Sequence, residues 1–325
     1  MDQDMNRRRA LACAGLLAAP ALAFAQGGFP NRPLRAIVPV PPGGGFDFVA
    51  RILADRMTKG LGQPVIVENR AGSGTLIGTD LAAKAAPDGY TLLTGSISNV
   101  ALNMGLYRKP PYDSLRDFDP VGLAVSYSYV LVARPDLQQK SLAEVIAYAK
   151  ANPARLTYAS AGNGSGQHVL PAALWRQARV EVSHIPYRGV QAGYQDLLGG
   201  RVDLLFDLWP TARTYIEGAR VTPLAVSGTK RQPTIPDTPT LIESGYKIEL
   251  ESWFGFFTQA KVPAAIKEKL RSELERVIAS REVSDIFRKS GGTSLSLSTA
   301  EMRELVRRDV ERWSRLVREL GISPD

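Results

Sequence analysis

The amino-acid sequence predicts an α/β protein of two lobes that are joined by two crossings of the chain. The chain has 325 residues, and at roughly 100 to 200 residues per domain this length suggests two domains. Hydrophobic residues make up 44% and charged residues 22%, which is close to globular averages and excludes a disordered, collagen-like or disulfide-stapled chain. From Pro33 onward, short β-rich runs alternate with amphipathic helical patterns, as in α/β folds.

Residues 1–25 differ from this average and predict a signal peptide that is cleaved after Ala25. Residues 7–9 are arginines that form a positive n-region, residues 10–22 are apolar and small, and residues 23–25 form an A-x-A cleavage site. The apolar run is shorter than the roughly 20 residues that span a bilayer, which argues against a membrane anchor. We therefore expect export to the periplasm, by either the general secretory or the twin-arginine route.

The predicted mature chain, which starts at Gln26, has no cysteine and a positive net charge. Without Cys13 it cannot form a disulfide and must rely on its core. It keeps 37 basic and 30 acidic side chains, a net charge of +7. Because acids and bases are interleaved, this charge argues against nucleic-acid binding and leaves a mild preference for anionic small molecules.

The first series of elements alternates strictly between strand and helix. Residues 35–40 are strand-like, and apolar residues then recur at helical spacing over 48–57. Residues 65–67 form the next predicted strand, 76–85 a helix and 90–94 a third strand. This series accounts for most of one α/β lobe.

A second series begins with residues 121–133, which are apolar enough for a buried strand. Ser141 and Glu144 then form a capping box, in which the serine oxygen accepts a backbone N–H and the glutamate reaches back. Helical segments separate the strands that follow. These strands are predicted at 156–159, 182–185, 202–206 and 221–226.

The last part of the chain starts with a predicted strand at 250–257 and ends in helices. Pro263 lies in the first turn of one helix, and Ser298 with Glu301 caps another that runs to about residue 320. Two helices after one strand cannot easily bury themselves, so we expect this part to pack onto the first lobe.

These elements divide the chain into a first lobe, residues 26–126 plus 250–325, and a second lobe, residues 127–249. The chain then crosses between the lobes near 124–134 and again near 245–256. Two α/β lobes with two such crossings form a hinged clamshell, in which a ligand lies between the lobes.

The first candidate site is the glycine-rich loop that joins the first strand to the first helix. Three consecutive glycines let backbone N–H groups approach a ligand, and the helix after them points its positive end the same way. This favours an anion site, and the alternative is a tight turn in which the aspartate caps the helix. The loop has neither a phosphate-loop lysine nor a G-x-G-x-x-G register, which argues against nucleotide binding. The candidate residues are Pro42, Gly43, Gly44, Gly45, Phe46 and Asp47.

A second glycine-rich loop, residues 160–166, occupies the equivalent place in the second lobe. Its polar side chains are neutral hydrogen-bonding groups, and its glycines again expose the backbone. Each stretch alone is more often a plain loop, but two such loops in matching positions can hold the two ends of a dianion. Residues 95–99 add hydroxyl and amide groups. The candidate residues are Ser96, Ser98, Ser160, Gly162, Asn163, Gly164 and Ser165.

A serine hydrolase is the enzyme hypothesis that the residues allow. Ser165, His168 and Asp207 would form its triad, but no G-x-S-x-G elbow is present. With two histidines in the whole chain, transition-metal sites are poorly supplied, and His184 is interpreted as structural. We expect no catalytic residue, no metal and no cofactor.

Many of these stretches resemble one family, the extracytoplasmic substrate-binding receptors of tripartite tricarboxylate transporters, also called the Bug family. The resemblance covers essentially the whole mature chain and keeps the order of the motifs. In the first lobe the matching stretches are 35–51, 61–70, 86–93 and 111–113. Later in the chain they are 158–164, 184–189, 196–200, 206–207 and 252–255.

The resemblance implies a type II periplasmic binding fold, no catalysis, and a small carboxylate captured between the lobes for integral membrane transporter subunits. It implies that backbone amides and water in the two glycine-rich loops hold carboxylates, with Ser96, His168 and Asp207 lining the cleft. Family members that bind amino acids use an acid at the Asp207 position for the ammonium group. The alternative for Asp207 is a cap on the next helix. We expect the receptor to be a monomer.

Phe46 departs from the family pattern, which has a small hydroxyl residue between the glycines and the aspartate. A ring at this position suggests an aromatic or otherwise more apolar carboxylate, such as an aromatic dicarboxylate. The alternative is that Phe46 packs into the lobe core. A ligand sensor that signals to a membrane partner has the same pocket as a transport receptor, so the sequence leaves both open.

Overall fold

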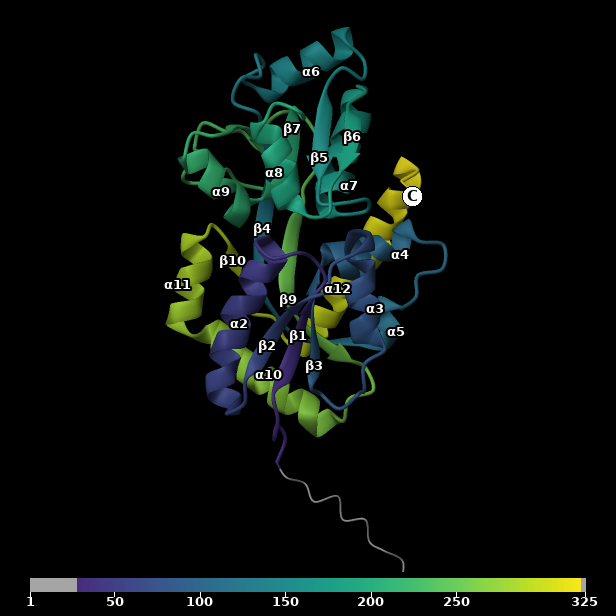
Figure 1. Cartoon of the computed structure of the whole chain (residues 1–325), viewed down its shortest axis with the longest axis vertical. Helices are drawn as coiled ribbons and strands as arrows, with labels where there is room; N and C mark the ends of the chain where they lie inside the picture. The colour runs from purple at the N-terminus through teal and green to yellow at the C-terminus, as the bar shows by residue number, and fades with distance from the viewer. Residues whose placement is uncertain (1–27, 323–325) are drawn as a thin grey trace, which may run out of the picture.

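The structure is a computed structural model that describes residues 28–322. The predicted signal peptide and its cleavage site therefore lie outside the described residues. Figure 1 shows the two-lobed α/β clamshell that the sequence predicts, with the first lobe below and the second above. Among residues 28–322, no helix has the length and apolar character needed to cross a membrane.

The strands of the described chain form one twisted sheet that continues through both lobes, in the order β2-β1-β3-β9-β4-β7-β5-β6. In the first lobe, β1 pairs in parallel with β2 and β3, while β9 runs antiparallel to β3 and β4. The strands of this half are β1 (Leu34–Val38), β2 (Val65–Asn69), β3 (Thr91–Ser96), β9 (Glu251–Gln259), β10 (Thr293–Ser294) and the first part of β4 (Phe118–Ala133).

The second lobe repeats this plan on a smaller scale. There β5 pairs in parallel with β6 and β7, and the end of β4 pairs antiparallel with β7 and β8. Its elements are α6 (Leu142–Ala151), β5 (Thr157–Ser160), α7 (Gly166–Ala178), β6 (Ser183–Pro186), α8 (Val190–Leu198), β7 (Leu204–Leu208), α9 (Trp209–Glu217) and β8 (Thr222–Val226).

The long strand β4 is the first crossing between the lobes. Its residues 118–128 pair with β9 in the first lobe, and residues 129–133 pair with β7 in the second. All sixteen of its residues are buried, which explains why the sequence reads as one continuous apolar run. The chain returns to the first lobe just before β9, whose Phe254, Phe256 and Phe257 are fully buried in the core.

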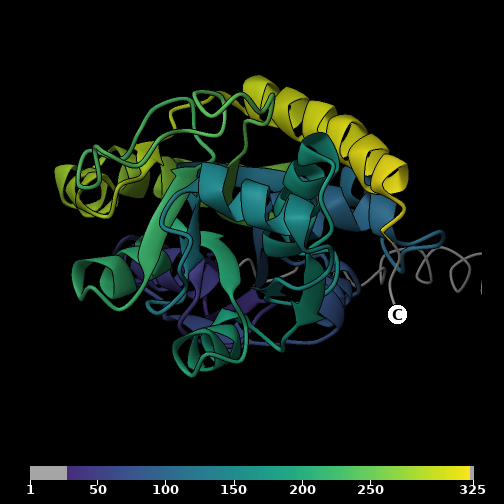
Figure 2. The same ribbon diagram turned by 90° about the horizontal axis from the view of Figure 1, so that it is seen from above.

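The C-terminal helices pack mainly on elements of the first lobe. In this lobe α10 packs on α2, and α12 packs on η2, α4 and β4 while also contacting α7 of the second lobe. Figure 2 shows α12 in yellow along one side of the molecule. The helices are α2 (Gly45–Leu61), η1 (Ser73–Thr75), α3 (Leu76–Ala83), η2 (Ile97–Leu102), α4 (Asn103–Leu106), α5 (Ser114–Asp117), α10 (Ala264–Ala279), α11 (Arg281–Lys289) and α12 (Thr299–Leu320).

Two details of the sequence prediction are wrong. The C-terminal part has a third helix, α11, because the helical pattern is interrupted at Ser280, whose extended backbone ends α10 and whose hydroxyl caps α11. At the start of α6, Ser141 accepts the N–H of Glu144 as predicted, but the Glu144 carboxylate accepts the N–H of Lys140. The capping box at Ser298 and Glu301 is confirmed.

The contact between β4 and β9 predicts that Gly255 tolerates no side chain. A Cβ at this position would meet the carbonyl oxygen of Gly122 and lie 2.7 Å from Cα of Leu123, both backbone atoms of β4. We expect Gly255→Ala to lower the free energy of unfolding by about 1 to 3 kcal/mol, the usual cost of overpacking. Chemical denaturation measures this; Gly28→Ala, where a Cβ has open space, is the control, and equal stability of both variants would contradict it.

Candidate ligand-binding site

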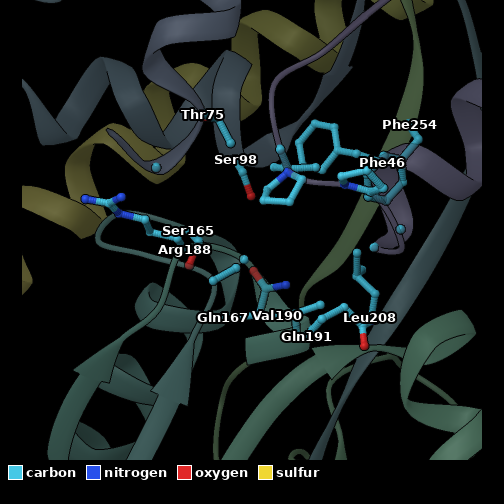
Figure 3. Close-up of a pocket in the computed structure, with 18 of the residues that line it drawn as sticks. Phe46, Thr75, Ser98, Ser165, Gln167, Arg188, Val190, Gln191, Leu208 and Phe254 are labelled. Atoms are coloured by element: carbon cyan, nitrogen blue, oxygen red, sulfur yellow. The ribbon is translucent and has the colours of Figure 1, made fainter. Parts of the chain in front are cut away.

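A cavity of about 60 Å³ lies where the two lobes meet (Figure 3). The first lobe contributes the loop before α2, the η1 turn and the start of η2, and the second lobe contributes the loops before α7 and α8 and the start of α9. Tyr129 of β4 and Phe254 of β9 complete the lining. The cavity is therefore formed by both lobes at the crossing strands, as expected for a clamshell.

The lobes are in direct contact around this cavity. The side-chain amide N–H of Gln191 on α8 donates to the carbonyl of Gly43 in the first lobe at 2.8 Å. The side-chain oxygen of Gln191 in turn accepts a hydrogen bond from the Tyr215 hydroxyl. The backbone N–H of Gly166 donates to the Ser98 hydroxyl across the same gap at 3.2 Å. These bonds show a closed arrangement of the two lobes.

Four helices of the described chain begin at this cavity. Their N-cap residues, Gly44 of α2, Ser165 of α7, Gly189 of α8 and Leu208 of α9, all belong to the lining. None of the four N-caps makes a side-chain capping bond within the described chain. Each helix end carries about half a positive charge in unpaired N–H groups. Four such ends, three of them from the second lobe, make the cavity favourable for an anion.

The charged side chains around the cavity agree with this polarity. Among the described residues of the lining there is no aspartate or glutamate, and Arg188 is the one ionised side chain. A carboxylate can therefore enter without meeting a like charge. The described residues contain no group of three histidine, cysteine or acidic side chains that could hold a metal ion.

Asp47 supports the first glycine-rich loop from behind. Its carboxylate accepts two bonds from Arg51, one from the side-chain amide of Asn69 and one from the N–H of Gly43. Burial opposes ionisation, but these bonds outweigh it and lower the pKa of Asp47. The alternative reading of Asp47 as the helix cap does not hold, because α2 begins after Gly44 without a side-chain cap.

Gly45 is placed where the two lobes are in close contact. A Cβ at Gly45 would lie 2.6 Å from a methyl carbon of Leu208 in the second lobe. At Gly44 a Cβ would only touch Val190 at 3.9 Å. The absence of a side chain is therefore needed at Gly45 for lobe contact, whereas at Gly44 a Cβ would fit without a clash.

The second glycine-rich loop rests on a stack of aromatic rings. The rings of His168 and His184 are parallel with centroids 3.8 Å apart, and Tyr158 stacks on His184 at 4.9 Å. The N–H of Gly164 donates to Nδ1 of His168, and Ser160 hydrogen-bonds Nε2 of His184 at 2.7 Å. Burial and the neighbouring His168 lower the pKa of His184 to about 3, so the His184 ring is neutral near pH 7.

The sequence-predicted residues fall into three groups in the structure. Those in the cavity lining are Pro42, Gly44, Gly45, Phe46, Ser98 and Ser165. Gly162 and Asn163 line an adjoining hollow, and Gly43 and Asp47 face a groove beside α2. The remaining residues are buried outside the lining, namely Ser96, Ser160, Gly164, His168 and Asp207. The contact of each residue with a ligand stays a prediction.

Phe46 combines the two alternatives that its position allows. Its ring packs edge to face on Phe254 with centroids 5.2 Å apart and is only 7% exposed. It also forms part of the cavity wall, as Figure 3 shows. The ring is thus a core residue that presents an apolar surface to the cavity.

Sequence reasoning missed several lining residues, above all Gln167, Arg188 and Thr75. Gln167 directly follows the second glycine-rich loop, and Arg188 lies within the stretch 184–189 that carries the resemblance, but the direction of both side chains depends on the fold. Thr75 ends the glycine-rich stretch 72–75, whose residues all have positive φ, including 90° for Thr75 itself. That stretch follows β2 in the same way as the first loop follows β1, and its glycines were a usable signal.

Asp207 lies outside the cavity lining and is hydrogen-bonded to Gln167, which belongs to the lining. It is fully buried, and its Oδ1 accepts the Gln167 side-chain amide at 3.3 Å, while Oδ2 has no partner among the described residues. Burial raises the pKa of Asp207 to about 7, although bonds from the N–H of Leu208 and from Gln167 favour the charged form. It does not cap α9, which has no side-chain cap.

The fold and the cavity define a two-lobed solute-binding protein. The chain belongs to the family of tripartite tricarboxylate transporter receptors, because residues 49–322 match the model for the "Tripartite tricarboxylate transporter family receptor". This confirms the resemblance seen in the sequence.

Individual relatives agree with this assignment. Protein BugT of Bordetella pertussis is 36% identical over 98% of this chain and 99% of its own length. The structure of the periplasmic binding protein BugD superposes with a TM-score of 0.86 at 33% identity, over 90% of this chain and 99% of that one. R. palustris Rpa4515, solved with adipate, has a TM-score of 0.87 at 30% identity, covering 92% of this chain and all of that one.

The raised pKa of Asp207 predicts a pH-dependent contribution to stability. Its ordinary pKa is 3.8 and its folded value is about 7, so the folded protein binds the extra proton between these values. The stabilising contribution is fully present below about pH 3.8 and is lost as the pH rises through 7. We expect Asp207→Asn to gain stability relative to the wild type between pH 5 and pH 8.

Melting temperatures of both proteins at each pH unit measure this difference. Other titrating groups, such as His184, affect both proteins and cancel in the comparison. If the melting temperatures of the two proteins differ by the same amount at every pH, Asp207 keeps an ordinary pKa and the prediction is wrong.

Proposed function

We propose that this chain is a periplasmic receptor that binds a small carboxylate between its lobes and delivers it to the membrane subunits of a tripartite tricarboxylate-type transporter. The family relationship supports the role in transport. The predicted signal peptide supports export. The receptor acts as a monomer that carries one ligand in its central cavity.

The convergence of four uncapped helix N-termini on one cavity is the observation that carries this proposal. Backbone N–H groups bind a carboxylate without a buried counter-charge, and charge-assisted bonds of this kind are about twice as strong as neutral ones. The bound adipate of Rpa4515 supports the same ligand chemistry, because that relative is similar over its whole length.

The bound carboxylate is released unchanged. The three residues of the hydrolase hypothesis make hydrogen bonds to three different partners. The Ser165 hydroxyl donates to the carbonyl of Gly162, Nδ1 of His168 accepts the N–H of Gly164, and Asp207 accepts from Gln167. Each is used to hold a loop or a side chain in place, which supports binding without catalysis.

A carboxylate panel tests the proposed function directly. We expect thermal shifts of several degrees with saturating carboxylates, because a ligand that binds only the folded state raises its stability by mass action. The panel contains monocarboxylates, dicarboxylates and tricarboxylates, both aliphatic and aromatic, with the corresponding amines as controls. The proposal fails if no carboxylate raises the melting temperature, or if a bound carboxylate or ester is converted to product.

Phe46 is predicted to favour aromatic over aliphatic ligands of equal charge. A ring pair contributes roughly 0.5 to 1.5 kcal/mol beyond area burial, which corresponds to a preference of up to about tenfold. In Phe46→Leu we expect the ratio of terephthalate to adipate affinity, measured by calorimetry, to fall by this factor. The variant also loses the contact with Phe254, so its melting temperature alone does not test the prediction. An unchanged ratio would mean that the ring does not contact the ligand.

A further inference from the structure

A larger hollow adjoins the cavity between the lobes. It has a volume of about 830 Å³ and shares part of its wall with the cavity, including Pro41, Gly74, Thr75 and Arg188. The cavity itself holds only about 60 Å³. A ligand too large for the cavity has room to extend into this hollow along the shared wall.

Arg188 is the charged side chain on that shared wall. It follows β6 and stands directly before Gly189, the N-cap of α8. Figure 3 shows Arg188 at the side of the cavity opposite Phe46 and Phe254. Among the described residues that line the cavity or the hollow, no other side chain is ionised. An anionic group in the hollow thus has one cation to meet.

The guanidinium of Arg188 is also uncommitted. Its side chain is exposed and makes no hydrogen bond, ion pair or ring contact with any described residue. Most other arginines of the two lobes have a bonding partner, as in the ion pairs of Arg51 with Asp47 and of Arg201 with Asp196. A planar guanidinium presents donors that match a carboxylate in a bidentate way, so an unpaired one beside a ligand cavity is suited to an acid group.

The η1 turn, which also lines the hollow, is held in an unusual backbone conformation. Ser73 and Thr75 have φ of 44° and 90°, and such strain in residues other than glycine is concentrated at ligand clamps. The strain is balanced by bonds around Thr75, whose hydroxyl accepts from Asn103 and whose carbonyl accepts from Thr79. Both residues face the hollow, and Thr75 also faces the cavity. The wall that the two spaces share therefore includes part of a fixed turn as well as Arg188.

We propose that Arg188 binds a second anionic group of the ligand, so that the receptor selects dicarboxylates over monocarboxylates of the same length. One carboxylate lies among the four helix N-termini, and the other reaches the hollow and pairs with the guanidinium. This inference rests on the proposed function and adds to it the class of ligand and the residue that selects it.

Calorimetry with matched probe pairs tests the inference. The pairs are adipate with hexanoate and terephthalate with benzoate, which differ by one carboxylate. We expect wild type to bind the dicarboxylate of a pair at least tenfold more tightly. Arg188→Gln should weaken dicarboxylate binding by about tenfold, the effect of one charge-assisted pair, and change monocarboxylate binding by less than twofold.

Arg155→Gln is the matched control. Arg155 is also an exposed arginine of the second lobe, and its side chain has no bond to a described residue, but it lies away from the cavity and the hollow. The Arg155→Gln substitution removes the same charge, so binding of both probes of each pair should stay at the wild-type level. Unliganded melting temperatures confirm that both variants are folded.

The outcomes separate the inference from the proposed function. If wild type binds carboxylates but Arg188→Gln leaves the ratio within each pair unchanged, the inference is overturned and the receptor function stands. Equal losses for both probes of a pair also overturn it, because Arg188 then acts on any anion. If wild type binds no carboxylate of either pair or of the wider panel, the proposed function itself fails.

Discussion

The need to satisfy four uncapped helix N-termini governs this molecule. Each end presents N–H groups without intrahelical partners, and α2 of the first lobe brings its end toward those of α7, α8 and α9 of the second. Closing the lobes gathers like partial charges around one small space. Under the proposed function a bound anion compensates this electrostatic cost, so the same ends that oppose an empty closed state favour a filled one. Selection of charge thus arises from backbone geometry.

The side chains around the site keep those N–H groups available by bonding elsewhere. Asp47, the acid closest to the first loop, is neutralised by Arg51 and held by Asn69. Ser165 stands at the start of α7, but its hydroxyl donates to a carbonyl of its own loop and does not cap the helix. The stacked histidines support this loop from the side away from the lining. The polar network therefore fixes two loops in place while leaving their helix ends open.

The sequence predicts most of the fold and the first layer of the site, because both depend on local signals. Alternating strands and helices are visible in the apolar pattern, and glycines mark the loops that approach a ligand. Gln167 and Arg188 were missed because their place in the lining arises only when two lobes meet, whereas the turn at Thr75 carried a glycine signal that was not used. Helix α11 was missed for a local reason: the break at Ser280 involves neither glycine nor proline. Asp207 was found by resemblance, yet only the fold shows that Gln167 stands between it and the cavity.

The uninterrupted strand β4 has a consequence for the entropy of binding. Its pairing passes from β9 to β7 between Ser128 and Tyr129, with no loop in between. A flexible linker would have to be immobilised each time the lobes close, and that ordering would be subtracted from the affinity. Here the connection is already ordered by ladder hydrogen bonds on both sides of the transition. A ligand with few atoms therefore loses less of its interaction energy to ordering this crossing than it would with a flexible linker.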